Sequence, residues 1–60
     1  MKLYSITELF HLTRAQLLAL HQESLTALAH WPEGSAEHAI ILANLRNIRA
    51  ALARLHPQPG

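Results

Sequence analysis

A chain of 60 residues forms one small domain at most, and the absence of cysteine excludes disulfide bridges and thiolate zinc sites. Half of the residues are hydrophobic and only 15% are charged, and the net charge of +1 does not indicate a nucleic-acid or membrane-surface protein. A chain this short buries only about 60% of its unfolded surface, so it needs a histidine-bound metal or a second subunit. The small share of charged residues available to cover the surface favours self-association.

The N-terminal segment, Met1 to Leu12, has no continuous apolar stretch, so it does not have the pattern of a secretory signal. No segment approaches the roughly 20 apolar residues of a membrane span. We therefore expect a soluble, cytoplasmic protein with no membrane partner.

The first helix is predicted from the capping box that Ser5 and Glu8 can form. It runs through about Leu12 and brings three residues to the core. These are Ile6, Leu9 and Phe10. We expect a break at Thr13, because this second capping residue stands directly before a new periodic run.

The second helix is predicted from Thr13 followed by Gln16, another capping box, and runs from about Arg14 to His30. Ser24 is interpreted as a surface residue of this helix. The apolar side of the helix comprises Leu17, Leu18, Leu25, Leu28 and Ala29.

A reversal of the chain is predicted next, because Pro32 disfavours helical geometry at the residue before it and Gly34 allows a tight turn. Ser35 is a natural N-cap for the last helix, which runs from about Ala36 to Leu55, before the C-terminal prolines. The apolar seam of this helix is Ile41, Leu45, Ile48, Leu52 and Leu55.

Two long helices joined by a short turn should lie antiparallel, so that Leu25 faces Ile41 and Leu18 faces Ile48. The expected fold class is all-α, with a short N-terminal helix followed by an antiparallel helical hairpin. The single domain spans residues 1–56, and residues 57–60 form a disordered tail. Surplus apolar residues outside the seams lead us to predict a homodimer that forms a four-helix-type bundle.

Side chains for catalysis or metal binding form no recognisable group. The histidines include no pair at the i,i+4 spacing, the carboxylates are scattered, and there is no phosphate loop or cysteine nucleophile. We therefore expect no enzymatic activity and no catalytic, cofactor or metal site. His21, between Leu18 and Leu25 on the apolar side, is interpreted as a structural or interface histidine, with a pH-sensing or metal role as the alternative.

The candidate interface residues are large or polar groups outside the predicted seams. The polar residues of segment 44–49 are interpreted as a solvated stripe in which arginine stems cover apolar surface. Alternatively, one of them fixes subunit register or binds an acidic partner. Trp31 either closes the end of the bundle or serves as an exposed anchor. The full candidate set is Leu20, Trp31, Ile40, Asn44, Arg46, Asn47 and Arg49.

A helix-turn-helix module is the alternative reading of the N-terminal half. Residues 4–9 and 12–17 look like the opening of such a module, with a recognition helix from Arg14 to Gln22. That helix has one arginine and few other groups for phosphates or base edges. A small DNA-binding regulator is therefore the alternative function and not the favoured one.

Residues 1–10, MKLYSITELF, and residues 43–49, ANLRNIR, resemble a group of short bacterial proteins carried on integrative and conjugative elements and genomic islands. That group has no established activity, so the resemblance assigns no site residue. It implies a bacterial accessory or regulatory protein of mobile DNA. The function predicted from the sequence is a non-enzymatic, homodimeric interaction or regulatory module with an unidentified protein partner.

Overall fold

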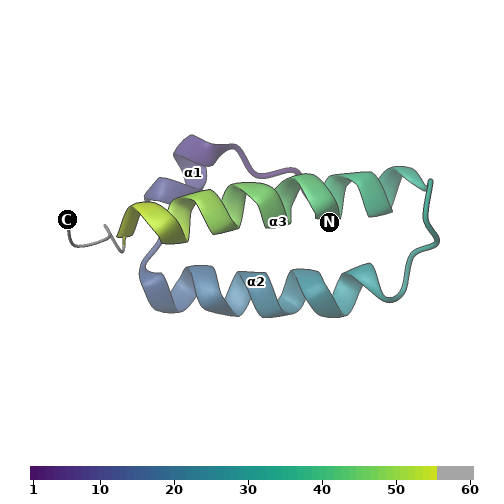
Figure 1. Ribbon diagram of the computed structural model, residues 1–60, viewed down its shortest axis with the longest axis horizontal. Coiled ribbons are helices and arrows are strands. Elements are labelled where there is room, and N and C mark those ends of the chain that lie inside the picture. The colour runs from purple at the N-terminus through teal and green to yellow at the C-terminus, as the bar shows by residue number, and fades with distance from the viewer. Residues whose placement is uncertain (56–60) are drawn as a thin grey trace.

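A computed structural model describes residues 1–55 of the chain, and the secondary-structure elements of this part are all helices. Its helices are α1 (Ile6–Phe10), α2 (Arg14–Leu28) and α3 (Ala36–Leu55), as Figure 1 shows. The predicted all-α class and the order of the three helices are confirmed. The predicted domain end at residue 56 and the predicted tail over residues 57–60 lie outside the described residues.

Both predicted capping boxes are present. The Ser5 hydroxyl accepts a hydrogen bond from the Glu8 backbone N–H, and the Glu8 carboxylate accepts one from the Ser5 N–H. Thr13 and Gln16 repeat this arrangement at the start of α2. The break before Thr13 is confirmed, although α1 and α2 each end two residues earlier than predicted.

The turn between α2 and α3 follows the prediction from its residue types. Gly34 has a φ of +88°, a conformation that L side chains rarely adopt. The Ser35 hydroxyl accepts from the His38 N–H at 3.1 Å and donates to the Pro32 carbonyl at 2.8 Å. Ser35 therefore caps α3 and also holds the turn in place.

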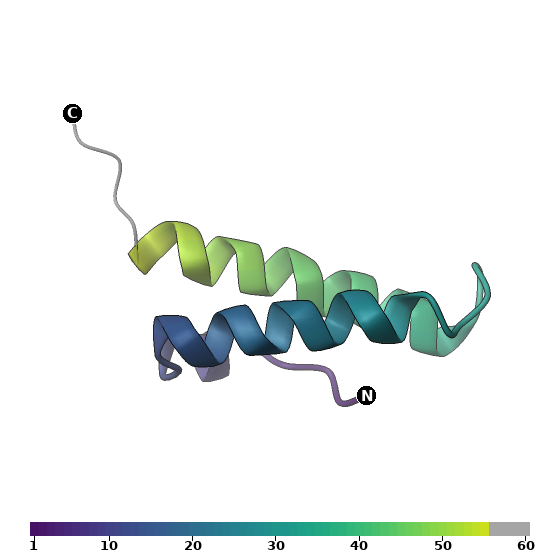
Figure 2. The same cartoon turned by 90° about the horizontal axis from the view of Figure 1, so that it is seen from below.

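The helices α2 and α3 form the expected antiparallel hairpin, and α1 packs beside α3 (Figure 1). The N-terminal segment and α1 both lie on one side of the hairpin, as the turned view shows (Figure 2). We call residues 1–5 the arm. The chain thus covers one side of its hairpin with its own arm and first helix.

The core lies where α1 meets the hairpin. Its fully buried members are Leu9, Leu17, Ile48 and Ala51. Complete burial of a leucine side chain contributes about 1.5–3 kcal/mol, so Leu9 alone gives the five-residue α1 a strong attachment. Of the predicted α1 core residues, Ile6 is half-buried and Phe10 is exposed. Since α1 reaches the hairpin from one side, only its Leu9 edge enters the interior.

The predicted seam of α3 is correct at Ile41, Leu45 and Ile48, which are all buried. Leu52 is half-buried, whereas Leu55 is 46% exposed and does not belong to the core. The seam is displaced toward α1, and the buried residues of α3 are Ile41, Asn44, Leu45, Ile48 and Ala51. The predicted seam assumes that α3 packs only against α2. In the structure α3 packs against both α2 and α1, so its buried side is wider on the side of α1.

The predicted apolar side of α2 is wrong at several positions. Leu18 and Leu25 are 44% and 39% exposed, and Ala29 is exposed as well. The buried residues of α2 are Leu17 and Ser24, and not the predicted Leu18 and Leu25. Helix α2 is rotated so that Leu20, one turn from Leu17, packs against the cluster around Leu9.

Candidate functional site

The arm is held against α3 by a buried asparagine. The Asn44 side-chain amide donates to the Lys2 carbonyl at 2.7 Å, and its oxygen accepts from the Tyr4 N–H at 2.8 Å. Asn44 is completely buried. The interpretation of Asn44 as part of a solvated stripe is therefore wrong, because its amide replaces a missing backbone partner for the arm.

Two more polar side chains of the hairpin contact the arm. Asn47 is half-buried and donates to the Tyr4 carbonyl at 3.1 Å. The Ser24 hydroxyl, fully buried, lies 3.8 Å from the Met1 sulfur. The interpretation of Ser24 as a surface residue is wrong, since the arm covers that part of α2. Both asparagines thus stabilise the arm within one chain.

The opposite side of the hairpin, which we call the open face, exposes two leucines of α2 and one leucine of α3. Leu18 and Leu25 each follow a buried residue of α2 by one position, a rotation of about 100° away from the Leu20 side. Leu42 follows the buried Ile41 of α3 by the same step and is 47% exposed. No other segment of residues 1–55 covers this face (Figure 2).

The charged residues near the open face are basic: Arg14 precedes Leu18 by one turn of α2, and the other two come from α3. Arg46 and Arg49 follow Leu42 by one and two helical turns, and they line a shallow groove of about 440 Å³ with Leu42 and Leu45. Both arginines are exposed. Their placement agrees with the expected solvated stripe, in which long aliphatic stems lie along apolar surface.

The carboxylates lie elsewhere. Glu8 pairs with Lys2 at 2.7 Å, and Glu37 pairs with the Met1 ammonium at 3.1 Å, both on the arm side. Glu23 lies two residues before Leu25, on nearly the opposite side of α2, and Glu33 is in the turn. The open face is therefore apolar at its centre and basic at its edge.

The other predicted interface residues do not gather into one patch. Leu20 is half-buried against the core on the arm side, and Ile40 is half-buried. Trp31 at the tip of the hairpin is 45% exposed, so it does not close the bundle within one chain. The structure brings Arg46 and Arg49 together on the open face and separates them from Leu20, Trp31 and both asparagines.

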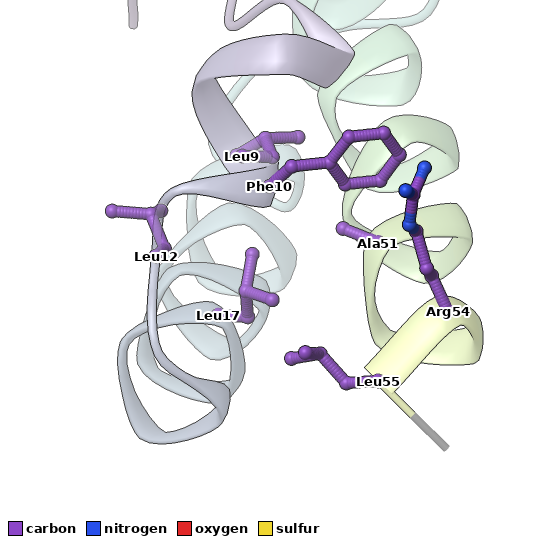
Figure 3. Close-up of a pocket in the computed structure, with 7 residues that line it drawn as sticks. All are labelled: Leu9, Phe10, Leu12, Leu17, Ala51, Arg54 and Leu55. Carbon is purple, nitrogen blue, oxygen red and sulfur yellow. The ribbon is translucent and has the colours of Figure 1, made fainter. Parts of the chain in front are cut away.

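A second hollow lies at the end of the bundle, where α1 and the following turn meet the last turn of α3 (Figure 3). Its volume is about 240 Å³. The Arg54 guanidinium lies over the Phe10 ring, 4.4 Å from the ring centre. We call this hollow the end pocket, and it is lined by Leu9, Phe10, Leu12, Leu17, Ala51, Arg54 and Leu55.

The titration of the arm is coupled to α1. A hydrogen bond from Lys2 holds the pKa of the Glu8 carboxyl below its usual value, and the Ser5 N–H acts in the same direction. The same contact with Glu8 raises the pKa of Lys2.

His21 is half-buried in α2. Within residues 1–55, no three histidine or acidic side chains gather into a group that could hold a metal ion.

The contacts of the arm are only partly predictable from the sequence. Asn44 and Asn47 have the i,i+3 spacing of residues on one helix face, and Asn44 falls directly beside Leu45 in the seam. A buried amide in an apolar seam needs partners, and an extended backbone is one that can satisfy both its donor and its acceptor. The arm was missed because its own sequence has no regular period.

Comparisons with protein families, with functionally characterised proteins and with solved structures gave no match for this chain. The resemblance to proteins of mobile elements stays a prediction. Among residues 1–55, no helix combines the length and the apolar character needed to cross a bilayer.

Proposed function

We propose that the protein is a non-enzymatic interaction module that pairs with a second copy of itself through the open face. The observation that carries this proposal is the exposure of Leu18, Leu25 and Leu42 on a side of the hairpin that its own arm does not reach. An exposed apolar patch with polar residues at its edge is typical of a protein interaction site.

Burial of the three leucines supports a second copy as the occupant. A two-fold pairing places the same patch on both sides of the interface, so three leucines from each chain leave water together. Full burial of an exposed leucine contributes about 1.5–3 kcal/mol, and these three are 39–47% exposed in the single chain, so each adds about 1 kcal/mol on pairing, a gain that a domain of this size needs for stability. Two hairpins joined in this way form a four-helix bundle.

The arginines at the edge of the open face set the expected salt dependence. Two copies bring Arg46 and Arg49 of both chains toward one another, while the acidic side chains remain on other surfaces. Salt screens repulsion between exposed like charges, so self-association should strengthen as ionic strength rises. An acidic partner on the same face would instead bind more weakly at high salt.

Sedimentation equilibrium tests the proposal. We expect the wild-type chain to be a dimer at micromolar concentration and the triple variant Leu18→Gln, Leu25→Gln, Leu42→Gln to be a monomer. Glutamine is a good helix former, so the variant should keep its helical circular dichroism. A matched control replaces Leu3 and Leu55, two other exposed leucines, by glutamine and should leave the dimer intact.

A wild-type chain that stays folded and monomeric at high micromolar concentration would reject the homodimer. A dimer that the triple variant retains would show that another surface mediates pairing. Dissociation by added salt, in place of strengthening, would also contradict pairing through a face whose charged residues are basic.

A further inference from the structure

The end pocket is separate from the open face and has the chemistry of a small-ligand site. We propose that it binds a monocarboxylate with a short apolar body, such as a medium-chain fatty acid anion. The apolar body would lie between α1, α2 and the end of α3, and the carboxylate would bind the Arg54 guanidinium. This proposal does not depend on homodimer formation.

The floor and walls of the pocket are apolar. Leu9, Leu17 and Ala51 are fully buried and form a floor that belongs to the core. Phe10 and Leu55 are exposed and stand at the rim (Figure 3). The volume of about 240 Å³ is below the roughly 300–1,000 Å³ of pockets for drug-sized ligands, so the end pocket suits a smaller molecule.

Arg54 supplies the polar contact. Its guanidinium lies over the Phe10 ring, and this cation–π contact uses none of the arginine N–H donors in a hydrogen bond. The ring also restricts the arginine, so less side-chain entropy is lost on binding. None of the side chains that line the pocket is acidic, and both ion pairs found within residues 1–55 involve other cations.

The single cation selects the ligand class. A carboxylate carries one negative charge and matches the planar fork of arginine with two parallel hydrogen bonds. A phosphate dianion would need a second positive group, and among residues 1–55 the pocket lining offers none. A neutral apolar molecule would fill the same space without using Arg54, so the ratio of anionic to neutral binding measures the role of this residue.

Octanoate and 1-octanol are the probes that separate these alternatives, with binding to the full-length chain followed by chemical-shift changes in two-dimensional NMR. We expect saturable shifts at Leu9, Leu12, Leu17 and Ala51 with octanoate. Since hydrogen bonds to charged groups are among the stronger ones, octanoate should bind about tenfold more tightly than 1-octanol. Arg54→Met should reduce that preference to near unity.

Arg46→Met is the matched control, because Arg46 is an exposed arginine of the same helix that does not line the end pocket. It should keep the tenfold preference, and Arg54→Lys should keep part of it. Should Arg54→Met lose its fold, Arg54→Lys still tests the proposal, because a charge without the planar fork should bind octanoate more weakly. Equal affinities for the two probes, an unchanged preference in Arg54→Met, or shifts confined to Leu18 and Leu25 would overturn the proposal.

Discussion

The two sides of the hairpin differ in whether the chain covers their surface. On the arm side, Asn44 and Asn47 make three hydrogen bonds to the backbone of residues 2 and 4, and the chain covers itself. On the open face, Leu18 and Leu25 remain exposed beside α3. Hydrogen bonds fix one segment in one register, whereas exposed leucines accept any apolar surface of suitable shape.

This difference separates the contacts that fold the protein from those that we propose for association. The buried amide of Asn44 would be costly without the arm, so the arm and the hairpin depend on each other. The leucines of the open face carry no such unsatisfied polar group, and a single chain tolerates their exposure. Variants on the two sides should therefore separate stability from association.

The largest effect is expected at Leu45, a core residue that lies within one turn of α3 from the open-face residue Leu42. Leu45→Asp places a carboxylate at a buried position, and this cost exceeds the stability that a 60-residue domain usually has, so helicity and association should both be lost. Far-ultraviolet circular dichroism at fixed protein concentration measures the loss.

Leu42→Asp is the matched control for Leu45→Asp. Leu42 lies three residues earlier on the exposed side of α3, so this variant should keep its helicity and lose only self-association. If Leu45→Asp remained helical, or if Leu42→Asp unfolded, the assignment of these two sides of α3 would be wrong.

The sequence was sufficient for the helices and their order, because these depend on local signals. Capping boxes at Ser5 and Thr13, and the glycine at Gly34, act within a few residues and are readable from spacing alone. The side of α2 that faces the core cannot be predicted from such local signals. Its sequence offers leucines on several sides, and the choice depends on where α1 packs, a contact between distant parts of the chain.

The candidate site is harder to predict from the sequence than the fold. The spacing of Arg46 and Arg49 predicts a stripe on one side of the helix, and the structure places them beside Leu42. The same pattern predicts that Asn44 belongs to this stripe, because polar residues are usually exposed. Its burial depends on the arm, which lies 40 residues away in sequence and has no period that predicts its path.

Loss of the Asn44 amide should have the next largest effect, since it tests the arm side directly. Asn44→Ala removes two hydrogen bonds and leaves the Lys2 carbonyl and the Tyr4 N–H without these partners, so we expect a loss of about 2–3 kcal/mol of unfolding free energy. Urea unfolding at fixed concentration measures this loss. Hydrogen exchange at the Tyr4 amide should accelerate as the arm is released.

Asn47→Ala provides the comparison for Asn44→Ala. Asn47 makes one bond to the arm, at 3.1 Å, and is only half-buried, so its loss should cost about 1 kcal/mol. Equal effects of the two variants would show that the buried position of Asn44 adds nothing to the attachment of the arm. Neither variant should change the state of association, because both residues lie away from the open face.

The smallest expected effect concerns the pH dependence of the arm side. The pKa of Glu8 is lower in the folded chain than the ordinary value of 4.5 for a glutamate, because Lys2 and the Ser5 N–H favour the charged form. The folded state therefore binds fewer protons than the unfolded state in this range. The stabilising contribution of Glu8 is complete above pH 4.5 and is lost as the pH falls through the folded pKa.

Glu8→Gln should flatten this acid limb and leave the cap in place, because Gln16 shows in α2 that a glutamine side chain completes the same box. Urea unfolding at neutral pH and below pH 4.5 measures the change, with Glu33→Gln in the turn as the control that should keep the wild-type slope. An acid limb that is as steep in Glu8→Gln as in the wild type would mean that the contact between Lys2 and Glu8 does not stabilise the arm. The arm would then depend on the asparagines alone, and the contrast between its directed hydrogen bonds and the apolar open face would be sharper still.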